Sequence, residues 1–136
     1  MHIKAEGKGK PLAFLLTGGE RHESRVFEEL MERGKVGRPG AGRPRLRSKR
    51  LAVDKAYSSH HIRDWLKGKK IRAFIPRGRH EKRLNKGFDK TLYKERNRVE
   101  RLIVRLKQFR RIATSYEKTA TSYLAMLTIG AILLWL

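Results

Sequence analysis

Two β-prone runs of apolar residues lie near the start of the chain, within residues 2–17. The glycine-rich spacer GKGK at residues 7–10 separates them, a pattern that predicts a β-hairpin. Ser24 then precedes a stretch with helical spacing of apolar residues, and serine is a favoured helix cap. The residues with that spacing are Val26, Phe27, Leu30 and Met31.

The middle of the chain predicts a strand, a helix and a second strand. Residues 51–53 form a short apolar run, and Asp54 follows at its carboxyl end. Ser59 can cap a helix that ends near Gly68, and residues 71–75 form a second apolar run. A strand–helix–strand unit of this length predicts a parallel crossover. Functional sites in such sheets lie beyond the carboxyl ends of strands, where Asp54 stands.

Residues 90–109 predict one long helix with three faces. An apolar stripe is formed by Leu92, Val99, Leu102, Ile103, Leu106 and Phe109. Tyr93, Arg96, Glu100 and Lys107 fall within an arc of about 60° beside it. An ordinary amphipathic helix needs only a buried and a solvated face, so the third face indicates a site. The alternative is that Glu100 only pairs with Arg96 one turn away.

The charge balance points to a polyanionic partner. The 136 residues suffice for one domain, and 34 Lys and Arg against 13 Asp and Glu give a formal net charge of +21. The regions 34–50 and 77–90 are basic and predict loops, either solvated linkers or arms that contact DNA phosphates. The cations expected to contact DNA are Arg38, Arg43, Arg45, Arg47, Lys49, Arg50, Arg77 and Arg79.

Residues 119–136 carry no charge and predict a C-terminal helix. Their length reaches the threshold for a membrane span, but threonine, serine, tyrosine and glycine interrupt the apolar run. We therefore expect a helix buried against the domain and no membrane partner. The absence of cysteine excludes disulfides and thiolate metal sites, and it fits a cytoplasmic bacterial protein.

The order of these motifs resembles that of a known enzyme family. The spacing Tyr-x2-Arg-x3-Glu-x6-Lys at Tyr93, Arg96, Glu100 and Lys107 resembles the signature around the last acidic residue of bacterial DDE-type insertion-sequence transposases, specifically the insertion sequence 4/5 group. Residues 11–24 are similar to the hairpin strand and following turn of these enzymes. Residues 51–57 are similar to their second acidic motif.

The resemblance implies a ribonuclease-H-like fold that uses three acids to hold divalent metal ions. Asp54 then matches the second acid and Glu100 the third, and both would bind Mg²⁺ or Mn²⁺. Arg96 and Lys107 would face DNA phosphates, where cations stabilise developing negative charge. Tyr93 would either bind a phosphate or orient Glu100, so these five residues form the expected catalytic set.

No residue matches the first acid of the family. The resemblance therefore implies that residues 1–136 form a single, partial α/β catalytic domain that lacks its first strand. We expect the chain to be inactive alone and to need an upstream transposase segment from another reading frame, or else to be a degenerate fragment. The implied partners are the element's terminal inverted repeats, target DNA and a second copy in a homodimer. The alternative function is a non-catalytic basic protein that binds nucleic acid, for which Asp54 and Glu100 would be irrelevant.

Overall fold

The predicted hairpin forms the first part of a mixed α/β structure. The computed structural model describes residues 1–18, 23–37, 39–43, 48–77 and 89–136. Strand β1 (His2–Ala5) pairs antiparallel with β2 (Pro11–Leu15), and the register shifts next to Ala5. In the connecting turn Gly9 has a φ of 84°, and an added Cβ there would lie 3.3 Å from the Cβ of Arg98. Glycine thus permits both the turn and the close approach of a later helix.

The predicted crossover unit is also present. Strand β3 (Arg50–Ala52) is followed by the short helix η1 (Lys55–Tyr57), helix α2 (His60–Gly68) and strand β4 (Arg72–Phe74). Strands β3 and β4 pair in parallel, as a crossover connection requires. The Ser59 side chain caps α2 by accepting a hydrogen bond from the N–H of Ile62 at 3.2 Å. The second strand is shorter than the predicted 71–75.

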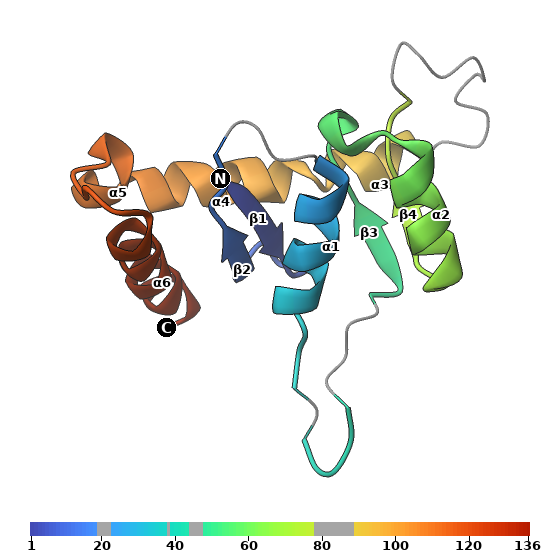
Figure 1. The fold of residues 1–136 in the computed structure, drawn as a ribbon, viewed down its shortest axis with the longest axis horizontal. Coiled ribbons are helices and arrows are strands. Elements are labelled where there is room, and N and C mark those ends of the chain that lie inside the picture. Colours follow the sequence, from blue (N-terminus) through green and yellow to red (C-terminus); the bar gives the residue numbers. More distant parts are fainter. Residues whose placement is uncertain (19–22, 38, 44–47, 78–88) are drawn as a thin grey trace.

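Helix α1 (Glu23–Arg33) lies between the hairpin and the crossover unit (Figure 1). Val26 and Leu30 pack with Ala13 and Leu15 of β2. On the other side of α1, Phe27 and Met31 join the core of the crossover unit. That core consists of Phe27, Met31, Val53, Ile62, Leu66, Ile71 and Ile75. One amphipathic helix therefore buries its apolar stripe partly against the hairpin and partly in the core of the crossover unit.

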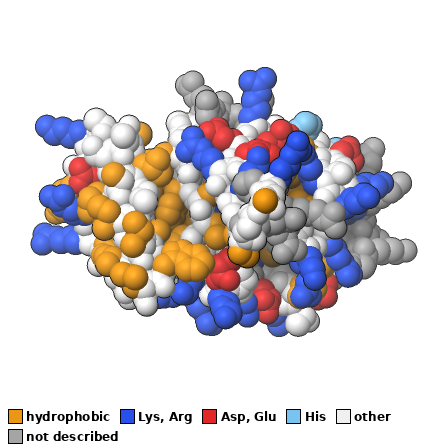
Figure 2. All heavy atoms as spheres, turned by 90° about the horizontal axis from the view of Figure 1, so that it is seen from below, with side chains coloured by type: hydrophobic (Ala, Val, Ile, Leu, Met, Phe, Trp, Pro, Cys, Tyr) orange, Lys and Arg blue, Asp and Glu red, His pale blue; other side chains and the backbone are white. Residues whose placement is uncertain are grey.

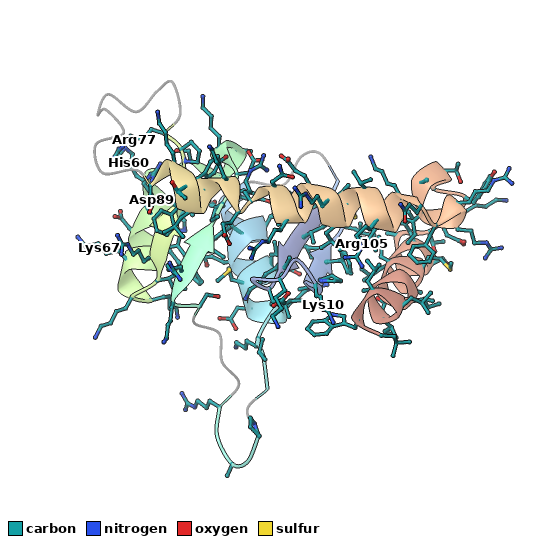
Figure 3. All side chains as sticks on the ribbon, turned by 180° about the vertical axis from the view of Figure 1, so that it is seen from behind. Lys10, His60, Lys67, Arg77, Asp89 and Arg105 are labelled. Carbon is teal, nitrogen blue, oxygen red and sulfur yellow. The ribbon has the colours of Figure 1, made fainter. Side chains whose placement is uncertain are left out.

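The single helix predicted over residues 90–109 is wrong in one respect, because it forms as two helices. Helix α3 (Lys90–Lys94) and helix α4 (Asn97–Lys107) are separated by a turn at Glu95 and Arg96. In this turn the N–H of Arg96 donates to Tyr93 O at 2.9 Å and that of Arg98 donates to Glu95 O at 3.0 Å. Bonds that reach back three residues tighten a helix without reversing it. The two helices consequently continue as one rod on the face of β1 and β2 opposite α1 (Figures 1 and 3).

The C-terminal helix α6 (Ala120–Trp135) packs with α4 and α5 (Arg110–Thr114) against the hairpin. Its Leu127, Gly130 and Ala131 are buried in a cluster with Leu102 and Leu106 of α4. One side of α6 is buried against the domain in this way, whereas its opposite side is open. That side exposes Ile129, Ile132, Leu133, Trp135 and Leu136.

Figure 2 shows the resulting apolar surface at this end of the molecule. Among the described elements, α6 packs against α4, α5 and β2, and because this helix is apolar all round, the side that faces away from them exposes apolar residues. None of the helices in the described part of the chain is both long and apolar enough to cross a membrane.

Candidate active site

The two acids singled out from the sequence meet at one guanidinium group. Arg96 donates from Nη1 to Oδ2 of Asp54 at 2.8 Å, and from Nη2 to Oε1 of Glu100. Asp54 lies just after β3 and Glu100 lies in the first turn of α4, so segments far apart in sequence converge here. Arg96 is 26% exposed, whereas the carboxylates are 46% and 52% exposed. The site is therefore open to solvent and to a ligand on one side.

Local backbone geometry holds Asp54 in place. The residue has an extended conformation and caps η1, with Oδ1 accepting a hydrogen bond from the N–H of Ala56 at 3.0 Å. One carboxylate oxygen thus fixes the side chain to its own turn, and the other faces Arg96. Strand β3 ends at Ala52 and the buried Val53 follows it, so Asp54 lies just beyond the carboxyl end of a parallel strand.

The helix rod positions the remaining members of the predicted face differently. Tyr93 lies one turn before Arg96, and the guanidinium is 5.7 Å from the centre of the Tyr93 ring. This distance is within the range of a cation–π contact. Lys107 lies at the exposed end of α4, seven residues beyond Glu100 and roughly 10 Å farther along the helix axis. The structure thus brings together Tyr93, Arg96, Glu100 and Asp54, but it does not bring Lys107 to them.

The donor set of this site suits one hard divalent cation. Mg²⁺ is commonly held by one or two carboxylates, with water and substrate phosphate filling its other positions. Asp54 and Glu100 supply two carboxylates that already share a single cationic group, and both are accessible. The described residues contain no group of three or more His, Cys, Asp or Glu side chains able to hold a metal. The residues therefore fit one hydrated ion, and they are too few for a pair of ions.

The predicted DNA-contacting cations occupy several surfaces. Arg43, Lys49 and Arg50 are exposed, and Arg77 is half-buried after β4. Arg50 belongs to strand β3 and not to the predicted loop over residues 34–50. The remaining four, Arg38, Arg45, Arg47 and Arg79, lie outside the described residues.

One polar cluster near the site was not anticipated from the sequence. The His2 ring forms hydrogen bonds through Nδ1 with the Tyr57 hydroxyl and through Nε2 with Thr17 Oγ1, the latter at 3.0 Å. The His2–Tyr57 hydrogen bond connects the start of β1 to η1, which directly follows Asp54. No short-range pattern could reveal it, because its members come from three separate segments.

Lys4 is the second unexpected feature, because it is a buried cation. Its Nζ donates to the carbonyl oxygens of Gly34 at 2.9 Å and Met31 at 3.4 Å, at the C-terminal end of α1. Burial lowers the pKa of Lys4 from the ordinary lysine value, and the charge of Glu32 partly opposes this shift. The alternation of β1 could have indicated that Lys4 points toward α1, but not that the helix end would accept its charge.

Comparison with known proteins gives a consistent result. The family model described as "Transposase DDE domain" matches residues 1–136. A protein of Brucella ovis (strain ATCC 25840 / 63/290 / NCTC 10512), with the printed name "Putative transposase for insertion sequence element IS6501", is 25% identical over 146 residues. The alignment covers 100% of this chain and 96% of that protein. No solved structure matches.

Proposed function

Because this chain belongs to the transposase DDE domain family, whose function is DNA transposition, we propose that Asp54 and Glu100 are its divalent-metal ligands. The observation that carries the proposal is the shared contact of both carboxylates with Arg96. Two acids from distant segments have little reason to converge at an open surface unless they act on a common cation. A structural ion pair would need only one of them.

The metal would supply Lewis-acid stabilisation of charge on the phosphate during strand cleavage and joining, and Mg²⁺ or Mn²⁺ suits the oxygen donors. Arg96 keeps the two carboxylates together in the absence of DNA. When DNA enters, Arg96 can turn from the carboxylates to a phosphate, where a bidentate contact stabilises negative charge. Tyr93 supports Arg96 from one side and can also hydrogen-bond a phosphate. Lys107 would contact the DNA backbone farther along α4.

We further propose that this chain is inactive alone. Chemistry that uses two metal ions needs more carboxylates than the two that meet here among the described residues. An upstream segment with another acid, in an otherwise ribonuclease-H-like domain of the insertion sequence 4/5 type, would complete the site. The separation of the two strand pairs is compatible with such an addition.

The substrate would be the terminal inverted repeats of an insertion element and its target DNA. The net charge of +21 favours a phosphate-rich partner, and the exposed Arg43, Lys49, Arg50 and half-buried Arg77 can supply contacts. The four basic positions outside the described residues would add to them. Assembly as a homodimer on paired DNA ends belongs to the same proposal.

The test is DNA cleavage by this chain together with the polypeptide encoded immediately upstream in its source DNA. The substrate is a supercoiled plasmid that carries both ends of the source element, incubated with Mg²⁺ or Mn²⁺. We expect nicking or linearisation by the combined protein and at least a hundredfold loss with Asp54→Asn or Glu100→Gln. Each substitution removes a charged ligand but preserves side-chain size.

The matched control is Glu95→Gln, which removes an acid from the same rod whose ion-pair partner among the described residues is Arg98. It should leave cleavage unchanged. Cleavage that survives both Asp54→Asn and Glu100→Gln would disprove the ligand assignment. Salt-dependent DNA binding without any metal-dependent cleavage by the combined protein would favour the alternative, a non-catalytic nucleic-acid-binding protein.

A further inference from the structure

The exposed side of α6 (the α6 face) is an apolar surface at one end of the molecule. Its larger residues, Ile129, Ile132, Leu133, Trp135 and Leu136, are each at least 45% exposed, and they lie in the orange area at that end of Figure 2. No element of the described chain covers them. Scattered apolar residues are common on protein surfaces, but a contiguous group of large ones marks a site of interaction.

Tertiary contacts at both ends of α6 fix which side of the helix is exposed. Near its start the Tyr123 hydroxyl donates to Ile112 O at 3.1 Å, and at its end the indole N–H of Trp135 donates to Pro11 O at 2.8 Å. Between them Gly130 lies against α5, where an added Cβ would be 2.9 Å from Cδ1 of Ile112. The helix cannot turn to bury its exposed side without breaking these contacts, so the α6 face is preorganised for a partner.

The exposed residues of α6 have the spacing of a seam between two helices. Ala125, Ile129, Ile132 and Leu136 follow one another at intervals of four, three and four residues, and all of them are exposed. Alternating intervals of three and four residues place side chains along one line of an α-helix, as at the a and d positions of a coiled coil. Such a line packs against the same line of a second helix, which indicates a helical partner.

The charge distribution favours a second copy of this chain as that partner. Residues 119–136 contain no charged side chain, and α6 is the single described helix of which this is true. A face without cations offers no contact to DNA phosphates, and a face without charge gives no specific contact to an acidic protein. Two chains of net charge +21 repel each other across their cationic surfaces, and they repel least where both present this neutral one.

The sizes of the side chains along the seam favour an antiparallel pair. In such a two-fold pair, Ile129 of each copy faces Ile132 of the other. At both ends of the seam Ala125 then faces Leu136, whereas a parallel pair would place alanine opposite alanine and leave a gap. Residues 110–118, which precede α6, carry three cations and one acid. A parallel pair would bring these two basic segments together, but an antiparallel pair keeps them at opposite ends of a helix roughly 24 Å long.

We propose that the α6 face joins two copies of this chain as an antiparallel helix pair around a two-fold axis. The inference rests on the proposed function only for the homodimer, to which it assigns a surface, and it does not depend on the metal ligands. Because both copies carry the same net charge, salt or bound DNA strengthens the pair by reducing their repulsion. DNA binding has the opposite dependence, since salt weakens contacts to phosphate. Two copies therefore associate most readily after each has bound DNA, which favours the pairing of two DNA ends.

The experiment is sedimentation equilibrium of the full chain, freed of nucleic acid and without metal ions, at about 0.1 M and about 0.5 M NaCl. We expect a monomer–dimer equilibrium whose Kd is lower at the higher salt concentration. Ile132→Gln should weaken dimerisation at least tenfold, because the two-fold axis places the substitution at two positions of the seam. The matched control is Val104→Gln on α4, where the side chain is 62% exposed outside the α6 face, and it should change the Kd less than twofold. Circular dichroism checks that both variants keep the helical content of the unmodified chain.

Introduced cysteines test the orientation of the pair, since the chain has no cysteine of its own. Ile129→Cys and Ile132→Cys chains, one of them tagged, are mixed under mild oxidation. The antiparallel pair predicts a cross-link mainly between the two variants, whereas a parallel pair would join each variant to itself.

Four results would each overturn the proposal: a monomer at both salt concentrations, equal effects of Ile132→Gln and Val104→Gln, cysteine variants joined mainly to themselves, or a monomer that binds phosphatidylglycerol vesicles through the α6 face. None of them would alter the metal-dependent cleavage expected of Asp54 and Glu100, so the two proposals fail separately.

Discussion

Replacement of Arg96 by methionine should increase the affinity of the site for a divalent cation. In the structure the guanidinium occupies both carboxylates, so an incoming ion competes with it for Asp54 and Glu100. Methionine keeps much of the apolar stem that lies beside Tyr93 but has no charge. The free carboxylates then bind the ion without first losing an internal partner.

The size of the effect follows from the exposure of the pair. Both carboxylates are more than a third exposed, so each ion pair contributes only about 0.2–1 kcal/mol. Loss of the two ion pairs in Arg96→Met therefore removes a cost of about 1 kcal/mol from metal binding, which corresponds to an approximately fivefold lower Kd for the ion. Removal of a positive charge about 4 Å from the bound divalent ion adds up to about 2 kcal/mol in a water-like dielectric. We therefore expect Mn²⁺ to bind about 5 to 150 times more tightly.

The assay is titration with Mn²⁺ at low salt, monitored by the electron paramagnetic resonance signal of the free ion. Arg98→Met is the matched control, because Arg98 lies on the same rod and pairs with Glu95 at 3.1 Å, not with Asp54 or Glu100. It removes the same charge from the chain and should change the Kd less than twofold. Unchanged or weaker binding by Arg96→Met, or an equal effect of both substitutions, would refute the reasoning.

Three other predictions concern stability and DNA binding. Leu127→Ala should lower the free energy of unfolding by about 2–5 kcal/mol because Leu127 is fully buried, whereas Leu133→Ala on the exposed side of α6 should lower it by less than about 1 kcal/mol. Urea denaturation of both variants measures the difference, and similar losses would show that α6 packs on a different side. Because the pKa of Lys4 is lowered in the folded chain, the unfolded chain binds more protons than the folded chain between that lowered pKa and 10.5. The free energy of unfolding should therefore rise with pH across this window. Lys4→Met should abolish that rise, as measured by unfolding at several pH values. Replacement of both Arg43 and Arg77 by glutamine should reduce the slope of log K against log salt for duplex DNA by roughly 2, as measured by fluorescence anisotropy; an unchanged slope would exclude both residues as phosphate contacts.

The parts of the fold that depend on neighbouring residues were predictable from the sequence. The hairpin follows from two β-prone runs around GKGK, and the parallel crossover follows from apolar runs on both sides of a capped helix. In these segments the residues that decide the structure are close together in sequence. The same holds for the position of Asp54 at the end of a strand.

Features that depend on distant contacts were not predictable. The turn that separates α3 from α4 lies at Arg96, where the side chain reaches Asp54 from another element. Helical spacing placed Lys107 with Glu100 by angle alone, but it ignored the distance along the axis. Which side of α6 remains exposed depends on the area that α4, α5 and β2 provide, and no periodicity within α6 indicates it.

The most direct test of the central claim is whether Asp54 and Glu100 bind the same ion. The measurement is the Mn²⁺ Kd of the unmodified chain, Asp54→Asn, Glu100→Gln and the double variant, all under one salt condition. Shared ligation predicts one ion per chain, at least tenfold weaker binding for each single variant, and a double variant much less affected than the product of the two single effects. Single variants with unchanged Kd, or strictly multiplicative effects at two separate ions, would contradict the account.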